Sequence, residues 1–300
     1  MHHKSESEMF TRSYMSRGGP HERLRESIAS FLGYEPPSGI PRKWERFSNI
    51  AILPSGSFEG GEWEGVVDRG LWKAVASGLE VDRLGIMGEV SGSTRDSGVR
   101  MLLGNDDWVV RKENGVQYGY NITECMFSAG NVNERRRMGD VPHEGEVIVD
   151  LFSGIGYYSL PILLHSGASH VHCCEWNEVA IDSLKWSLER NGVTSRCTIH
   201  PGDNRETCKS IGKVADRVIM GLLPSSEESL GAAMEVLSES GGVIHVHGLA
   251  KPSRYMEWGE GVATKLCGYR PGSRAEILGI NRVKSYAPRW DHVVLDVNIL

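Results

Sequence analysis

The second half of the chain alternates short apolar runs with longer amphipathic ones. The apolar runs have the length of strands: "EVIVDL", "SHVHCCEW", "CTIHPGD", "ADRVIMGL" and "GGVIHVHGL". Between them, "YYSLPILLHS", "EVAIDSLKWSLERNG" and the stretch from about Ser225 to Ser238 are typical of helices. This alternation predicts a parallel sheet with helices on both faces. The closing stretch, "AEILGINRVKSYAPRWDHVVLDVNIL", predicts two antiparallel strands, joined by a proline-containing turn, at the edge of that sheet.

The first half has a mixed pattern. Helices are predicted near 21–33 and 69–78, and short strands in "FSNIAILPSGSF", "GVRMLLG" and "DWVVRKENGVQYGYNI". Asn114-Gly115 stands between two strand-like runs, which is a strong sign of a hairpin. We therefore expect three parts: a flexible tail at residues 1–20, a small α+β domain at 21–118 and a larger α/β domain at 119–300.

Composition places the chain among globular proteins. It has 300 residues, of which 40% are hydrophobic and 24% charged, enough for one substantial core. No apolar run approaches the roughly 20 residues that a membrane helix needs, and the first 25 residues contain no signal-peptide core. We expect a cytoplasmic protein without a membrane partner, acting as a monomer.

The cysteines and histidines give no sign of a metal site. The six cysteines form no CxxC pair, so we expect reduced thiols and no bound metal. Cys173 and Cys174 are neighbours on a predicted strand, and their side chains should therefore face opposite ways. His2 and His3 lie in the predicted tail, where they are best interpreted as surface residues.

Net charge limits how the chain can bind nucleic acid. A formal charge of −6 argues against binding through bulk charge, but it allows local basic surfaces. Three clusters are candidates, and each can equally be solvated surface charge: Arg135-Arg136-Arg137; Arg95, Arg100 and Arg111; and Arg282, Lys284 and Arg289.

The first candidate for chemistry is the turn after the first strand of the α/β pattern, "DLFSGIGYYSLP" at residues 150–161. In open α/β sheets the ligand lies outside the carboxyl ends of the strands, near such a turn. Gly154 and Gly156 would let the backbone approach a ligand, and Asp150 would offer an anion to a cationic or hydroxyl-bearing group. The alternative is a tight turn that simply requires glycine. A dinucleotide site would have glycine where Ser159 stands, and an acid beside a diphosphate would be repulsive, so S-adenosylmethionine fits better.

Two further strand ends carry suitable polar groups. Glu175 ends the second strand, 19 residues after Gly156, where a carboxylate can accept hydrogen bonds from both ribose hydroxyls. Asp203 and Asn204 end the third strand, where they can pair with the adenine amino group and a ring nitrogen. Together the three strand ends are far more specific than any one of them.

The fourth strand end, "GLLPSSEES", bears on the reaction. It lacks the Pro-Cys nucleophile of cytosine-carbon methyltransferases and the Asn/Asp-Pro-Pro-aromatic motif of enzymes that modify exocyclic amino groups. Pro224, Ser225 and Glu227 are our candidates for the wall of the substrate pocket. On sequence alone, they can equally be the ordinary first residues of a helix.

These segments together resemble a known family. "DLFSGIGYYSLP", "CEWN", "GDNR", "GLLPSSE" and "VKSYAPRWDHVVLDV" are similar to the tRNA wybutosine-synthesising aminocarboxypropyltransferases, siblings of the enzymes that methylate the guanosine 3′ of the anticodon. The resemblance implies a class I S-adenosylmethionine-dependent methyltransferase fold, a Rossmann-like α/β sheet with a smaller N-terminal α+β domain. It also implies that Ser128 and Arg135, in "CMFSAGNVNERRR", match cofactor-contacting positions, although Arg135 stands where lysine is common.

The resemblance further implies the reaction. It is the transfer of the 3-amino-3-carboxypropyl group of S-adenosylmethionine to the 4-demethylwyosine base beside the anticodon of phenylalanine tRNA, with methylthioadenosine as by-product. Two alternatives stay open: a guanine methyltransferase acting on tRNA, and a non-catalytic RNA-binding scaffold. The sequence identifies no general base. Phe127 or Tyr157 can help by stacking on the base, although core packing is the more ordinary role for either residue.

Overall fold

The computed structural model describes residues 18–88 and 97–300. The chain divides into two compact units, Met1–Glu89 with Val99–Asp106, and Val90–Gly98 with Asp107–Leu300. The sequence analysis placed a boundary between residues 118 and 119, which lies inside strand β6 (Val116–Asn121) of the second unit. Most of the expected tail lies outside the described residues, and so do His2, His3 and Arg95.

The first unit combines two helices with a small sheet. Its strands follow the order β1-β2-β3-β4, in which β2 and β3 are parallel and the other pairs antiparallel. The helices α1 and α2 pack on each other and bury Leu24, Ile28, Leu71 and Val75. The helices predicted near 21–33 and 69–78 are both confirmed. The bounds are α1 Pro20–Leu32, β1 Glu45–Phe47, β2 Ile50–Leu53, α2 Arg69–Gly78, β3 Arg83–Ile86 and β4 Arg100–Leu103.

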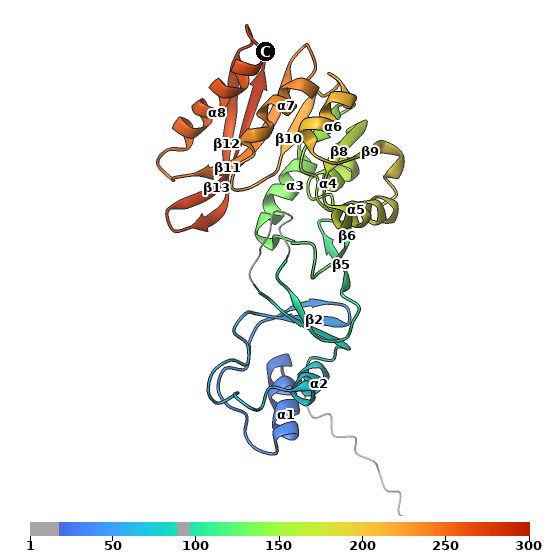
Figure 1. Cartoon of the computed structure of the whole chain (residues 1–300), viewed down its shortest axis with the longest axis vertical. Helices are drawn as coiled ribbons and strands as arrows, with labels where there is room; N and C mark the ends of the chain where they lie inside the picture. The colour runs from blue at the N-terminus through green and yellow to red at the C-terminus, as the bar shows by residue number, and fades with distance from the viewer. Residues whose placement is uncertain (1–17, 89–96) are drawn as a thin grey trace, which may run out of the picture. The chain divides into compact units, whose positions relative to one another are not determined.

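The second unit is built on a seven-stranded sheet in the order β12-β13-β11-β10-β7-β8-β9 (Figure 1). The strands from β7 to β11 run parallel, and β13 pairs antiparallel with both β11 and β12. The predicted parallel sheet and the predicted terminal hairpin at its edge are therefore both confirmed. The bounds are β7 Val147–Asp150, β8 His170–Glu175, β9 Cys197–Pro201, β10 Arg217–Met220, β11 Gly242–Ala250, β12 Ala275–Ala287 and β13 Trp290–Ile299.

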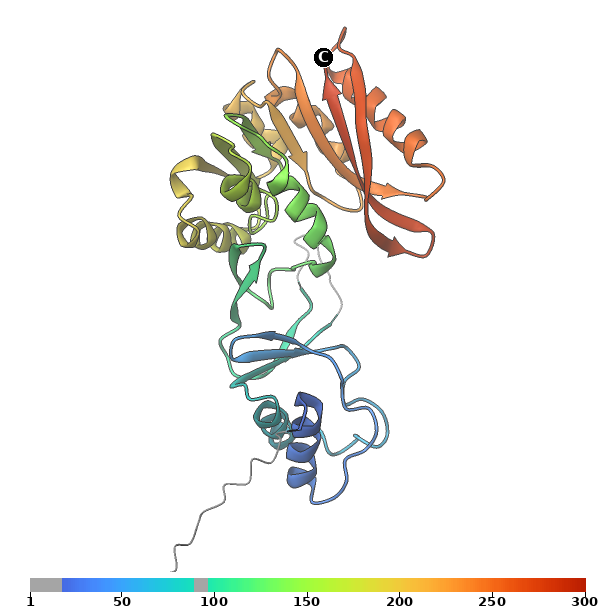
Figure 2. The ribbon, with the colours of Figure 1, turned by 180° about the vertical axis from the view of Figure 1, so that it is seen from behind.

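Helices cover both faces of this sheet, as the pattern predicts. Helices α6, α7 and α8 lie along one face, and α3, α4 and α5 along the other (Figures 1 and 2). The cysteines of β8 follow this division, because Cys173 donates a hydrogen bond to Ser159 of α4 whereas Cys174 pairs with Cys208 of α6. The bounds are α3 Val132–Asp140, α4 Ser159–His165, α5 Glu178–Arg190, α6 Asn204–Ile211, α7 Leu230–Val236 and α8 Tyr255–Tyr269.

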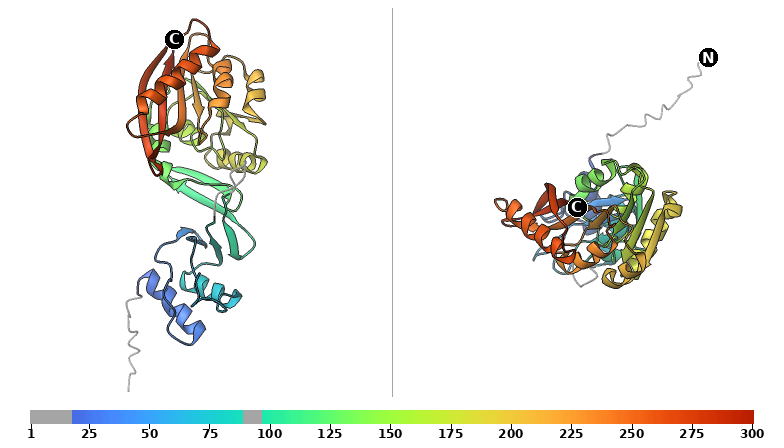
Figure 3. Two further views of the ribbon diagram at one scale, coloured as in Figure 1. Left: turned by 60° about the vertical axis from the view of Figure 1, so that its left-hand side comes forward. Right: turned by 90° about the horizontal axis from the view of Figure 1, so that it is seen from above.

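Some helices differ from the sequence pattern. The helix expected from about Ser225 begins with a 3-10 turn, Glu227–Ser229, and continues as the short α7. The pattern missed α3, α6 and α8; α8 lies against β12 and β13 (Figure 3). Across residues 18–88 and 97–300, none of the helices has the length and apolarity required to traverse a bilayer.

The hairpin predicted at Asn114-Gly115 is present. Strands β5 (Trp108–Glu113) and β6 pair antiparallel around this turn, in which both residues have positive φ, 49° and 80°. The hairpin packs on α5 through close contact at Gly119, where a Cβ would come within 2.3 Å of the Trp186 ring. Only glycine leaves room for this packing, which holds the segment after β6 near the sheet.

Candidate functional site

The glycine turn joins β7, in the middle of the sheet, to α4. Gly154 and Gly156 have φ of 52° and 93°, in the left-handed region that favours glycine. A Cβ on Gly154 would lie 2.4 Å from the Tyr157 ring, and one on Gly156 would lie 2.7 Å from Leu160. Both glycines are thus required by the turn itself, whatever the turn binds.

Asp150 is part of the framework of this turn. Its side chain is fully buried, and it accepts hydrogen bonds from the Phe152 N–H at 3.2 Å and the Ser159 hydroxyl at 2.7 Å. Burial raises the pKa of the Asp150 carboxyl to about 6, and these hydrogen bonds oppose the rise. From the sequence, Asp150 is expected to be an anion open to a ligand. In the structure its carboxylate is hydrogen-bonded to the turn and to the first residue of α4.

Glu175 connects the end of β8 to the same turn. Its Oε2 accepts a hydrogen bond from the Gly154 N–H at 2.7 Å. Its Oε1 accepts from the N–H groups of Trp176 and Asn177 at 2.9 and 2.8 Å. Burial raises the pKa of the Glu175 carboxyl, and the three backbone hydrogen bonds act in the opposite direction. Two of the predicted site positions are therefore in direct contact, and the half-buried carboxylate retains lone pairs for a ligand.

The third strand end separates two neighbouring residues. Asp203 caps α6 by accepting from the Arg205 N–H at 2.9 Å, and it stays partly exposed beside the Arg205 guanidinium. Asn204 is buried: its amide donates to the Leu151 carbonyl at 2.9 Å and accepts from the Ser229 hydroxyl at 2.8 Å. Both ends of the amide are thus bound to protein, and in this structure Asn204 connects the glycine turn to α7.

Ser128 and Arg135 lie together near the start of α3. The Arg135 guanidinium is 1% exposed and holds Glu113 of β5 through two hydrogen bonds of 2.5 and 2.7 Å. It also donates to the Ser128 carbonyl at 2.9 Å and lies over the Phe127 ring. The Ser128 hydroxyl accepts from the Lys284 ammonium at 2.6 Å, a contact between segments too far apart in the chain to be predicted from local patterns. Arg135 is thus a buried ion-pair residue that fixes the backbone at Ser128.

The segment before Ser128 packs on the glycine turn. The Tyr157 hydroxyl donates a hydrogen bond to the Met126 carbonyl. Phe127 contacts the rings of Tyr118, Tyr120 and Tyr157, and the guanidinium groups of Arg111 and Arg135 lie over it. This cluster joins the segment before Ser128 to Tyr157 of the glycine turn, and it makes Phe127 a packing residue.

The expected basic clusters are largely paired. Arg137 holds both Glu134 and Asp296 at 2.6 and 2.7 Å, and Arg282 holds Asp291 at 2.8 Å. Together with the buried pair of Arg135, these contacts neutralise much of the charge that the sequence places at 135–137 and 282–289. Arg136 is the exposed member of its cluster.

A cavity of about 140 Å³ lies at the carboxyl ends of β10 and β11. The three residues predicted for a pocket wall, Pro224, Ser225 and Glu227, all line it. Residues 246–249 of β11, which include His247, and Trp258 of α8 also line it, and neither His247 nor Trp258 was a candidate from sequence. The signal that could have found His247 is the pair of histidines in the otherwise apolar run "VIHVHGL". This cavity occupies the place that the rule for open α/β sheets assigns to a ligand.

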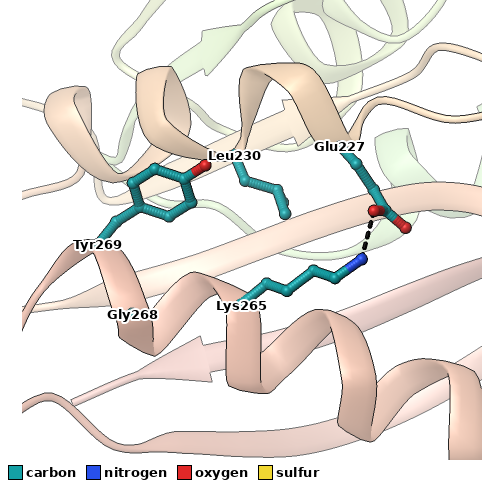
Figure 4. A pocket seen from close by; sticks show the side chains of 5 residues that line it. All are labelled: Glu227, Leu230, Lys265, Gly268 and Tyr269. Carbon is teal, nitrogen blue, oxygen red and sulfur yellow. Dashed lines mark hydrogen bonds and ion pairs between the residues drawn. The ribbon is translucent and has the colours of Figure 1, made fainter.

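A second, more open cavity of about 400 Å³ lies between the start of α7 and the end of α8 (Figure 4). Glu227 borders both cavities, and its carboxylate forms an ion pair with Lys265 across the second one. That ion pair joins the start of α7 to α8 and lies away from the glycine turn. We therefore assign the chemistry to the smaller cavity at the strand ends. Among the residues that the structure describes, no cluster of three or more histidine, cysteine or acidic side chains is arranged to hold a metal.

Comparison with known proteins decides the family. Residues 109–260 match the model of the TRM5/TYW2 methyltransferase domain, which covers the glycine turn, Glu175, Asn204 and the cavity. The chain belongs to the TRM5/TYW2 family. It is 43% identical to the "tRNA wybutosine-synthesizing protein 2/3/4" of Arabidopsis thaliana over 93% of its own length and 29% of that protein's. It is 36% identical to the human "tRNA wybutosine-synthesizing protein 2 homolog", over 88% of its own length and 70% of that protein's.

Solved structures agree with this family. The structure of Pyrococcus horikoshii TYW2 in complex with MeSAdo aligns with a TM-score of 0.76 and 28% identity, covering 92% of this chain and 99% of that one. Methanocaldococcus jannaschii TYW2 in complex with AdoMet aligns with a TM-score of 0.68 and 25% identity, over 86% of this chain and 99% of that one. The class I methyltransferase fold and the family resemblance expected from the sequence are thereby confirmed.

Proposed function

We propose that this TRM5/TYW2 family member transfers the 3-amino-3-carboxypropyl group of S-adenosylmethionine to the 4-demethylwyosine base beside the anticodon of phenylalanine tRNA. The observation that carries the proposal is the contact between Glu175 and the Gly154 N–H, at the end of a sheet whose neighbouring strands border a cavity. Family membership and the AdoMet bound by one solved relative support the same interpretation.

The residues at the turn suit a nucleoside cofactor without phosphates. Glu175 is placed to accept hydrogen bonds from ribose hydroxyls, next to the backbone of the glycine turn. Among the described residues, no basic side chain hydrogen-bonds to residues 150–158, where a pyrophosphate would require positive partners. Asp203, Ser128 and Arg135 stay candidates for further cofactor contacts, and the buried Asp150 and Asn204 would act by holding the turn.

The chemistry depends on which carbon of the cofactor faces the base. The cofactor, when bound, supplies a sulfonium flanked by three carbons, any of which a nucleophile can attack in line. The cavity wall formed by Pro224, Ser225 and Glu227 would orient the base so that its carbon meets the methionine chain. No cysteine lines this cavity, so the described wall offers no thiol for covalent catalysis.

For the RNA we propose contacts at the turn between β12 and β13. Trp290 and Tyr286 are exposed there, and Lys251 lies over the Trp290 ring at 5.5 Å. An exposed aromatic beside a lysine can stack on an unpaired base and attract a phosphate. A relative of known structure, aTrm5, was solved as a complex with tRNALeu. The role of residues 21–118 as a tRNA-facing domain, the monomeric state and the cytoplasmic location stay predictions.

Two labelled cofactors test the proposed transfer. S-adenosylmethionine labelled in the carboxyl carbon should pass its label to tRNA carrying 4-demethylwyosine, whereas label in the methyl group should stay with the by-product. The opposite result would identify a methyltransferase, and failure of both labels with retained tRNA binding would indicate an RNA-binding scaffold.

Matched variants then test the cofactor site. Glu175→Gln should weaken cofactor binding about 10- to 100-fold, the effect of about 1.5–3 kcal/mol for a hydrogen bond to a charged group. Glu178→Gln, on the exposed first turn of α5, should leave the affinity unchanged in the same calorimetric titration. Equal affinities in the two variants would remove Glu175 from the cofactor site.

A further inference from the structure

Two buried histidines from neighbouring antiparallel strands form a pair at the cavity. His247 of β11 and His292 of β13 are 1% and 0% exposed, and His247 Nδ1 lies 2.9 Å from His292 Nε2. One of these two nitrogens must carry a proton and the other must accept it, so the pair shares a single hydrogen bond. That bond uses one of the two ring nitrogens of His247.

The other nitrogen of His247 has no partner. Among residues 18–88 and 97–300, no hydrogen-bond partner lies near His247 Nε2, although the atom is buried. A buried polar atom is normally satisfied by protein, water or a ligand. Because His247 is one of the residues that line the cavity at the strand ends, a molecule entering that cavity is the partner that we consider for this nitrogen.

The position of His247 relates it to the glycine turn. Its ring lies 4.9 Å from the ring of Tyr158, which directly precedes α4 and follows Gly156 and Tyr157. A Cβ on Gly248 would meet Trp258 of α8, so alternation along β11 directs His247 to the opposite face of the sheet. The His247 ring therefore lies on the Tyr158 side of β11, beside the turn that we assign to the cofactor, and the same residue borders the cavity that we assign to the base.

Transfer to an aromatic carbon releases a proton that some group must accept. We propose that Nε2 of His247 accepts this proton from the acceptor carbon of the base, and that His292 is a positioning residue which accepts from His247 Nδ1–H. The inference rests on the proposed function. As the new carbon–carbon bond forms, the carbon–sulfur bond breaks and its electron pair goes to sulfur. The electron pair of the carbon–hydrogen bond then returns to the ring, and His247 takes the proton and passes it to water.

The surroundings keep His247 neutral, as a proton acceptor must be. Burial, followed by the neighbouring His292 and His245, lowers the pKa of His247 well below 6.5. The charged groups that face it from other elements are Arg137 of α3, which acts in the same direction, and Asp296 of β13, which opposes it weakly. Tyr158 contributes a neutral ring, because burial raises the pKa of its hydroxyl far above the physiological range.

The test compares two alanine variants in single-turnover transfer with the carboxyl-labelled cofactor. His247→Ala should lower the rate at least about 100-fold, the lower end of what general-base catalysis supplies. His172→Ala, in a second histidine pair elsewhere in the sheet, should leave the rate within about threefold of wild type. The wild-type reaction in the same experiment reports the proposed function independently, since it shows whether the carboxyl label reaches tRNA at all.

Three further readouts separate proton transfer from structure. Cofactor and tRNA affinities of His247→Ala should match wild type, and added imidazole should restore at least a tenth of the lost rate. The restored rate should rise with pH as imidazole becomes neutral. His247→Gln, which keeps a polar side chain of similar size, should fold and stay inactive. A rate near wild type in either variant would overturn the proposal, as would loss of cofactor affinity or failure of imidazole to restore the rate.

Discussion

One sheet holds two histidine pairs of nearly the same geometry. In each pair an Nδ1 lies 2.9 Å from an Nε2, the ring centroids are 5.1 Å apart and the rings are tilted by 40°. His172 and His200 lie on β8 and the edge strand β9, where both are half-buried. His247 and His292 lie on β11 and β13, fully buried beside the cavity at the strand ends.

The difference shows that burial and position, and not pair geometry, decide what a histidine pair can do. At the edge, water can replace either hydrogen-bond partner, and a third ring, His170, lies 4.8 Å from His172. In the interior, the hydrogen-bond partner of His247 Nδ1 is fixed, and its second nitrogen is buried without a partner among the described residues. The interior pair thus leaves Nε2 of His247, a residue that lines the cavity, without a partner among the described residues, whereas the edge pair is open to water.

The largest difference between the two pairs is expected when His292 and His200, the partners of His247 and His172, are substituted. His292→Leu should destabilise the protein by about 1–3 kcal/mol, because the buried His247 ring loses the one hydrogen bond that it makes among the described residues. It should also slow transfer about tenfold, since neither ring orientation nor tautomer is then fixed. His200→Leu should cost less than about 1 kcal/mol and leave transfer unchanged, because the edge position is open to water. Urea unfolding and single-turnover assays measure both effects.

His292→Gln provides the control for this pair of variants. The glutamine carbonyl can accept from His247 Nδ1–H, so this variant should recover most of the transfer rate that His292→Leu loses. Equal rates for the leucine and glutamine variants would contradict a positioning role for His292.

The sequence predicted the strand ends because the physics of a parallel sheet brings them together. Alternating apolar runs identify β7 and β8, and the carboxyl ends of adjacent parallel strands must meet at one edge. Glu175 and Gly154 are therefore neighbours, as expected, although 21 residues separate them. The turn at Asn114-Gly115 was equally accessible, since it depends on two adjacent residues.

Partners that depend on packing could not be predicted in this way. His247 and His292 are 45 residues apart, and their contact requires the register of β11 against β13. Arg135 looked like a member of a basic surface, but it is buried against Glu113, because the hairpin folds back onto α3. Sequence spacing identifies which residues reach an edge, whereas their actual partners follow from which helix covers that edge.

The third strand end extends the comparison to an interior and an edge residue that are adjacent in sequence. Asn204→Ala should cost about 2–3 kcal/mol, because it leaves the Leu151 carbonyl and the Ser229 hydroxyl unsatisfied inside the protein. Arg205→Ala removes an exposed ion pair with Asp203, which solvent screens, and should change the stability far less than Asn204→Ala does. Urea unfolding midpoints of the two variants, compared at an unchanged m-value, give the change in unfolding free energy for each. Similar costs would show that Asn204 does not connect the glycine turn to α7.

The smallest effect concerns pH and the edge pair. Burial, with His170 and His200, lowers the pKa of His172 to about 4, so the unfolded chain binds its proton more readily than the folded protein. This histidine therefore contributes stability that is complete above its ordinary pKa of 6.5 and is lost as pH falls towards about 4. The pH dependence that Asp150 contributes has the opposite sign. Its pKa is raised in the folded protein, so its contribution to stability decreases as pH rises through about 6.

His172→Gln should consequently flatten the fall in unfolding free energy between pH 6.5 and 4, measured by urea titration at a series of pH values. Thr194→Val, in the exposed 3-10 turn before β9, removes a polar group that does not titrate and should leave the slope unchanged. The effect of His172→Gln should be smaller than those above, because the half-exposed ring is partly solvated in the folded state. If His172→Gln leaves the slope unchanged, His172 binds its proton equally well in the folded and unfolded states, because water solvates the edge pair in both. The contrast with the buried pair is then greater than we infer.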